Sequence, residues 1–129
     1  VILVNCSNMT VKDVILNNAT SGLQVWSSEN IKVTNITSRN NQGFRILIFK
    51  SSNITVAKSE IRSNNFGEMG SGITIVDSSN ITVSESIVTN NKYYGLEIYN
   101  VQNITLQTIR SWTTAGEYLE QISTTSQAA

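Results

Sequence analysis

The chain repeats one phrase five times at an interval in the twenties. Each copy begins with an Asn followed by an apolar–polar–apolar triplet, such as Ile-Thr-Val. The intervals between the leading residues are 22, 23, 27 and 23 positions, for Asn8, Asn30, Asn53, Asn80 and Asn103. A repeat of this length is typical of a solenoid, in which each repeat forms one layer that stacks on the next.

Each repeat contains three short apolar segments separated by turns. In the fourth copy, residues 72–91, Ser78-Ser79-Asn80 separates the first two segments and Asn90-Asn91 closes the third. The segments have the length of strands and are too short for helices. Because Asn tolerates the left-handed backbone conformation, it can turn the chain sharply. The sequence therefore predicts an all-β fold, a parallel β-helix of about five rungs with three short strands in each.

The order of these motifs resembles a known family of repeats. Asn-Ile-Thr-Val, a Ser-rich turn, Asn-Asn and Gly-Ile/Leu-x-Ile follow one another as in right-handed parallel β-helix proteins of the pectate-lyase-like superfamily, and more closely as in its NosD-like branch. The resemblance covers residues 1–115 and implies a β-helix. Such repeats occur in lyases, hydrolases, epimerases, metal-insertion accessory proteins and surface spacers, so the resemblance implies no single activity.

The chain is expected to be one β-helix domain over residues 1–129, a segment of a longer solenoid. Repeats fill 1–115, and 116–129 is expected to be a terminal rung or a polar tail. Alternate residues of a strand point to opposite sides. The residues predicted to face inward are Leu23, Val25, Ile73, Ile75, Leu96 and Ile98 in the first strands, Met9, Ile31, Val33, Ile54, Val56, Ile81, Val83, Ile104 and Leu106 in the triplets, and Ile36, Ile61, Ile87 and Ile109 in the third wall. Glu117 falls at an inward position, so either the register breaks there or an inward charge protects the edge.

The outward residues of the first strands form the candidate binding surface. One predicted column contains Val4, Trp26, Phe49, Val76 and Tyr99; the adjacent column contains Ile2, Gln24, Leu47, Thr74 and Glu97, with Arg45 beside it. Aromatic faces stack on the apolar faces of sugars, and polar neighbours bond to hydroxyl groups. We therefore predict that a polysaccharide is bound by Trp26, Phe49, Tyr99, Arg45 and Glu97. The alternative is that the aromatic column packs against a neighbouring domain, loop or subunit.

The sequence predicts no catalytic residue, no metal and no other cofactor. Histidine is absent, which removes the commonest general base and metal ligand. We expect the Cα atoms of Asp77 and Glu97 to lie roughly 10–11 Å apart, too far to predict a catalytic carboxylate pair. A pectate-type lyase would need several clustered oxygen ligands for calcium. Cys6, Met9 and Met69 are too few for a copper site.

The composition of the chain limits the kinds of partner that it can bind. The net charge is zero and no basic stripe is present, so no nucleic-acid partner is predicted. No apolar run is long enough to span a membrane, and the single cysteine excludes a disulfide within the chain. The chain opens on the uncapped apolar strand Val1–Val4 without a basic leader. A neighbouring domain, or end-to-end self-association, is therefore expected to cover that edge.

The predicted function is a non-catalytic β-helix segment of an extracytoplasmic protein, whether secreted, periplasmic or on the cell surface, that contacts polysaccharide. The Asn-x-Ser/Thr sequons that follow the repeat agree with such a location. One alternative is part of a carbohydrate-active enzyme, a polysaccharide lyase, glycoside hydrolase or epimerase, with catalytic residues elsewhere or in the inserted loop 66–71. The resemblance suggests another, a NosD-like accessory protein for a periplasmic copper enzyme.

Overall fold

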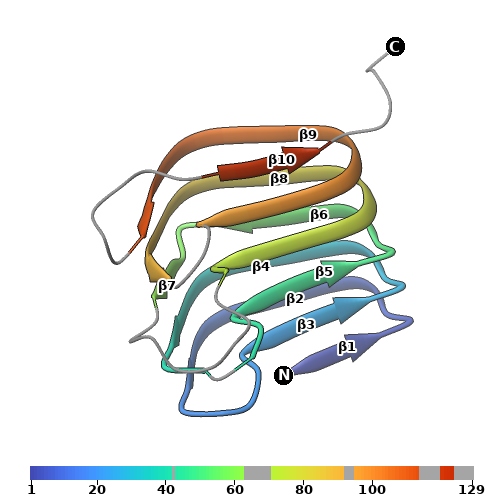
Figure 1. Cartoon of the computed structure of the whole chain (residues 1–129). Coiled ribbons are helices and arrows are strands. Elements are labelled where there is room, and N and C mark those ends of the chain that lie inside the picture. The colour runs from blue at the N-terminus through green and yellow to red at the C-terminus, as the bar shows by residue number, and fades with distance from the viewer. Residues whose placement is uncertain (42, 63–70, 92–94, 114–119, 124–129) are drawn as a thin grey trace.

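The chain coils into a parallel β-helix in a computed structural model that describes residues 1–41, 43–62, 71–91, 95–113 and 120–123. Successive turns of the coil stack on one another (Figure 1), and every strand pair in the described residues is parallel. This confirms the predicted all-β fold. Within the same residues, no helix has the length and hydrophobicity needed to cross a membrane.

Three walls run along the coil, and each is built from one strand segment per turn. The first wall contains β1 (Ile2–Val4), β3 (Leu23–Trp26), β5 (Ile46–Phe49), the starts of β8 (Ile73–Asn91) and β9 (Leu96–Thr113), and β10 (Glu120–Ser123). The second and third walls contain β2 (Ser7–Asn17), β4 (Glu29–Arg39), β6 (Ser52–Ala57), β7 (Glu60–Arg62) and the remainders of β8 and β9. Long strands such as β4 therefore bend from one wall into the next.

Corners form where a residue adopts the left-handed conformation. Each corner position repeats in every turn, with φ between 48° and 58°, in the columns Asn5, Ser27, Lys50, Asp77 and Asn100; Asn8, Asn30, Asn53, Asn80 and Asn103; and Asp13, Asn35, Lys58, Glu85 and Thr108. The Asn side chains also connect turns, since Asn30 Nδ2 donates to Asn8 Oδ1 at 3.0 Å and Asn53 Nδ2 to Asn30 Oδ1 at 3.1 Å. The Asn that leads each repeat thus turns the chain and, along part of its column, bonds the layers together.

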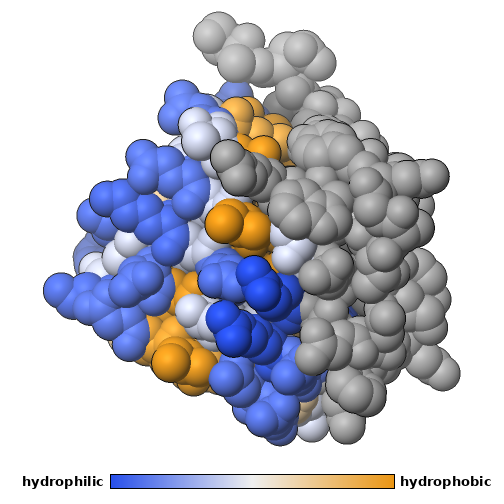
Figure 2. Space-filling view, turned by 90° about the vertical axis from the view of Figure 1, so that its left-hand side faces the viewer, coloured by the Kyte–Doolittle hydropathy of each residue, from blue (hydrophilic) through white to orange (hydrophobic). Residues whose placement is uncertain are grey.

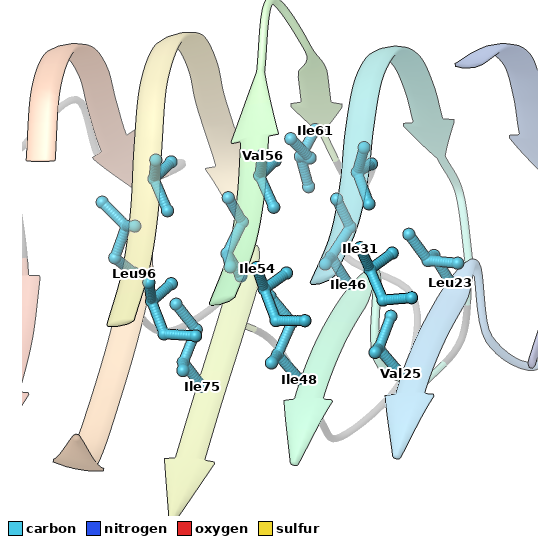
Figure 3. Packing of buried hydrophobic residues seen from close by; sticks show 14 of the residues in the cluster. Leu23, Val25, Ile31, Ile46, Ile48, Ile54, Val56, Ile61, Ile75 and Leu96 are labelled. Carbon is cyan, nitrogen blue, oxygen red and sulfur yellow. The ribbon is translucent and has the colours of Figure 1, made fainter. Parts of the chain in front are cut away.

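The core is a ladder of aliphatic side chains inside the coil (Figure 3). Apart from Ile87 in β8, the predicted inward residues of β3, β4, β6 and β8 are almost fully buried, with Leu23, Val25, Ile54, Val56, Ile73 and Ile75 each at 0% exposure. Burying one such side chain stabilises the fold by about 1.5–3 kcal/mol. Met9 pairs in register with Ile31, yet it is 40% exposed, because it lies in the first layer of the coil.

Serine hydroxyls complete the interior at the corners. Ser51 Oγ donates to Phe49 O at 3.0 Å and accepts from the backbone N–H of Ser28 at 3.1 Å. Ser28 and Ser78 make the same pair of bonds in the turns on either side. A backbone N–H that faces a corner rather than a strand partner is thereby satisfied, as buried polar groups generally are.

The prediction that Ile87 faces inward from the third wall is wrong. Ile87 is 36% exposed, whereas Val88 is fully buried. β7 and β8 pair Glu60 with Ile87 and Ile61 with Val88, so the inward column contains Val88. The left-handed residue Glu85 resets the alternation at the corner, and Ser86, not Ile87, is the first inward residue after it.

The described part of the last rung is the strand β10. The predicted inward Glu117, and the start of the rung at 116–119, lie outside the described residues, as does the inserted loop at 66–70. β10 pairs Glu120 with Leu96 and Ile122 with Ile98. A strand of a further rung is therefore stacked on β9 at residues 120–123.

Candidate functional site

The predicted outward column of the first wall is present in the structure. The register aligns Val4, Trp26, Phe49, Val76 and Tyr99 across β1, β3, β5, β8 and β9; we call this column the aromatic strip. The rings of Trp26 and Phe49 meet edge to face with centroids 4.8 Å apart at 61°. Tyr99 lies two turns beyond Phe49 and is 60% exposed. The strip therefore has a packed aromatic pair and a separate, freely accessible tyrosine.

Hydrogen bonding fixes the orientation of the tryptophan. Trp26 Nε1 donates to Gln24 Oε1 at 2.8 Å, and both residues lie on the outward side of β3. The indole therefore has two restraints, the Phe49 ring and the Gln24 amide. A fixed aromatic ring loses little conformational entropy when a ligand stacks on it.

The column beside the aromatic strip is only partly open. It contains Glu97 in register with Thr74 and Leu47, as predicted. Leu47 and Thr74 are each only 4% exposed although they point outward, while Glu97 is half-buried. Of this column, Gln24 and Glu97 can contribute polar groups at the edge of the aromatic strip.

Arg45 does not lie on the open surface where the sequence placed it. Its side chain has 0% exposure, and its Nη1 donates to Gly43 O at 2.8 Å. Two extra residues after Gly43 place Arg45 just before β5, where the equivalent turns have a glycine such as Gly22. Burial lowers the pKa of the Arg45 guanidinium by desolvation, although an arginine stays protonated at neutral pH.

A polar groove runs beside the aromatic strip, along the first corner of the coil. It comprises two hollows of about 370 and 390 Å³ that share Lys50 and Ser52. One hollow continues past Asp77 to Asn100, and the other past Glu29 to Asn5. We call this feature the corner groove. Sequence analysis missed it, although the repeated Ser-Ser beside one corner residue per turn is the signal that could have indicated it.

Lys50 connects the corner groove to the aromatic strip. Its Nζ lies 5.2 Å from the centroid of the Phe49 ring, within the range of a cation–π contact. In the next turn the corner residue is Asp77, whose carboxylate accepts a hydrogen bond of 2.6 Å from Asn100 Nδ2. The groove therefore combines a cation, carboxylates, hydroxyls and amides along a surface bordered by aromatic rings.

The side of the molecule away from this corner has a different character. Figure 2 shows it as a hydrophilic surface with scattered hydrophobic side chains. On the third wall, Glu60 Oε1 lies 2.6 Å from Arg62 Nη2 and 3.4 Å from Arg39 Nη2. One carboxylate is therefore shared by two arginines, and these three side chains provide no aromatic surface.

A metal centre has no ligand set among the described residues, because no three His, Cys, Asp or Glu side chains come together there. Cys6 is half-buried, and its Sγ lies 3.4 Å from Val4 O. Met9 lies in the first layer of the coil and is 40% exposed, and Met69 lies outside the described residues. The arrangement is suited to stacking and hydrogen bonding with an extended polar ligand.

Comparison with known proteins gives one family match and several similar structures. The family described as right-handed beta helix region matches residues 1–111, whereas no curated protein sequence matches. Tailspike protein 2 from Escherichia coli O157:H7 bacteriophage CAB120 superposes with a TM-score of 0.59 at 16% identity, over 84% of this chain and 18% of its own. The periplasmic alginate epimerase AlgG superposes with a TM-score of 0.57 at 13% identity, over 97% of this chain and 39% of its own.

These structural similarities concern the fold alone, given the low identities. The chain spans less than two fifths of the length of either protein. The family match does not distinguish the NosD-like branch from other right-handed β-helices.

Proposed function

Because this chain belongs to the right-handed β-helix family, we propose that it binds a polysaccharide along the aromatic strip in an extracytoplasmic setting, as a segment without catalytic residues of its own. The observation that carries the proposal is the register that places Trp26, Phe49 and Tyr99 in one outward column. A polymer lying along the coil axis would meet these rings in succession.

The contacts available fit a sugar chain. Pyranose rings have apolar C–H faces that stack on aromatic rings, while their hydroxyls need hydrogen-bond partners at the rim. Trp26 and Phe49 supply a packed stacking surface, and Tyr99 supplies a second one. Gln24, Glu97 and the corner groove supply polar groups on either side.

A structural neighbour supports the ligand class and the location. AlgG is described as a periplasmic alginate epimerase, and alginate is a polysaccharide. The comparable fold supports glycan contact outside the cytoplasm for this chain, and the residues of the aromatic strip, rather than the fold, would determine what is bound.

The proposal is tested by titrating tryptophan fluorescence with a panel of polysaccharides while the same samples are assayed for new chain ends. We expect a saturable change without new ends. Since Trp112 also emits, Trp26→Phe is the matched control and should lose most of the change. Tyr99→Ala should weaken binding by roughly 5–30-fold, the loss of about 1–2 kcal/mol for an aromatic contact. Absence of saturable binding across the panel would contradict the proposal.

An enzyme is the second candidate, favoured by the likeness to an epimerase. Its catalytic residues would lie beyond the described strands. New chain ends, or a changed sugar configuration detected by NMR in the product, would favour the enzyme over a binding segment.

We also propose that another domain or a second copy covers the first layer of the coil. Ile2 and Val4 are 63% and 54% exposed there, and Met9 of the same layer is 40% exposed. Such a partner would bury apolar side chains that otherwise face solvent.

A further inference from the structure

We infer that the polysaccharide is a neutral one, held across both the aromatic strip and the corner groove, and that polyuronates are discriminated against. This inference rests on the proposed function and names the substrate class of the same surface. Two observations carry it, the balance of charge around the surface and the continuity of the groove.

The accessible charges around this surface are mainly negative. Among the described residues, the corner groove contains Glu29 and Asp77 against one cation, Lys50, and Glu97 borders the aromatic strip. Arg45 is a further described cation near the first wall, but its side chain is fully buried. In the described part of this surface, three carboxylates therefore face a ligand against one lysine ammonium group.

Lys50 is also partly committed within the protein. Its ammonium group lies over the Phe49 ring, and its corner position is adjacent to that of Asp77 in the next turn. An acidic sugar one turn to either side of Lys50 would meet Glu29 or Asp77 without a second described cation to balance it. Unpaired like charges of this kind are a common means of excluding a wrong partner.

The groove follows the coil axis, which determines how a chain would lie. Its two hollows meet at Lys50 and extend in opposite directions across successive turns. Parallel strands are spaced about 4.8 Å apart, close to the length of one pyranose unit in an extended chain. Each sugar would therefore face one turn, where it meets a corner residue and serine hydroxyls of that turn. In a polyuronate every unit carries a carboxylate, so the repulsion would recur along the chain.

The size of the discrimination follows from solvent-exposed charges. One exposed charge contact of about 0.2–1 kcal/mol changes an affinity by a factor of roughly 1.4 to 5. With an excess of two carboxylates, a polyuronate is expected to bind roughly 2 to 25 times more weakly than a neutral chain of equal length. Salt should reduce the difference, because screening at about 1 M shortens the Debye length to about 3 Å.

The experiment measures dissociation constants for neutral oligosaccharides (β-glucan, mannan, xylan and galactan series) and for alginate oligosaccharides of the same length. The test variant carries Glu29→Gln, Asp77→Asn and Glu97→Gln together; an amide at 77 can still accept the Asn100 hydrogen bond. The matched control is Glu85→Gln, an exposed carboxylate at a different corner.

We expect wild type and the Glu85→Gln control to bind a neutral series more tightly than alginate. The triple variant should lose most of this preference, so that its dissociation constants for alginate and for the neutral series agree within about threefold, whatever their absolute values. Alginate binding to wild type as tightly as the best neutral series would overturn this inference and leave the proposed function standing. No binding of either class would overturn both.

Discussion

Replacing Ser51 with alanine should destabilise the β-helix by about 2–3 kcal/mol, although it removes only one oxygen atom. Ser51 is 5% exposed at the first corner. Its hydroxyl donates to Phe49 O and accepts from the Ser28 N–H of the preceding turn. The substitution therefore breaks two contacts at once, and one of them connects two layers of the coil.

The size of the expected loss in unfolding free energy depends on the Ser28 N–H, which Ser51→Ala leaves without an acceptor. An ordinary hydrogen bond contributes about 0.5–1.5 kcal/mol net, whereas a buried donor left without an acceptor costs about 1–3 kcal/mol. The residue that contains this donor, Ser28, is 4% exposed, and an alanine methyl group cannot accept its N–H. The second penalty therefore dominates.

Urea denaturation followed by circular dichroism measures the effect. For an m-value of about 2 kcal/mol per M, the midpoint should fall by about 1–1.5 M without a change in slope. Ser52→Ala is the matched control, because Ser52 is half-buried and its side chain makes no hydrogen bond with a described residue. It should change stability by less than about 0.5 kcal/mol.

Hydrogen exchange provides an independent readout at one atom. The Ser28 amide should exchange faster in Ser51→Ala than in wild type, relative to amides of the flanking strands β3 and β4. If Ser51→Ala and Ser52→Ala have equal effects on the midpoint, and the Ser28 amide keeps its protection, the reasoning about the corner serines is refuted.

Two other substitutions test the packing of the coil. Gly22→Ala should lower the free energy of unfolding by about 1–3 kcal/mol or more in the same denaturation assay. The reason is that a Cβ at this position would collide with Arg45 O and lie 2.5 Å from Ser38 Oγ. An unchanged midpoint would mean that the turn before β3 can move freely. Val88→Ala should lose about 2 kcal/mol from an enclosed site, and Ile87→Ala less than about 1 kcal/mol. The reverse order would show that the third wall has the register expected from the sequence rather than the one in the structure.

The period of the sequence was sufficient to predict the architecture. Equivalent residues of successive copies, such as Ile31, Ile54 and Ile81, pair directly in register. The column containing Trp26, Phe49 and Tyr99 was predicted in the same way, by counting from the corner that follows each first strand. This worked because neighbouring turns have the same length between those points, so the side-chain alternation stays in phase.

The predicted side-chain directions were wrong where the alternation of inward and outward residues is interrupted. Ile87 follows the left-handed Glu85 at a corner, and alternation cannot be counted through such a residue. Arg45 belongs to a two-residue insertion after Gly43 and has a buried position instead of the expected outward one. Both residues lie beside a corner, where the backbone conformation, and not the sequence of apolar residues, determines the direction of a side chain.

The sequence by itself determined that this protein is a parallel β-helix, which residues form most of its core, and that Trp26, Phe49 and Tyr99 share one outward column. Those properties are local and periodic, so a repeated pattern of side chains is enough to specify them. Only the tertiary structure decided that Arg45 is buried and that Lys50, Glu29 and Asp77 share one groove. Such a groove arises from the stacking of turns 22 to 27 residues apart, and its depth and charge depend on how the corners superimpose in space.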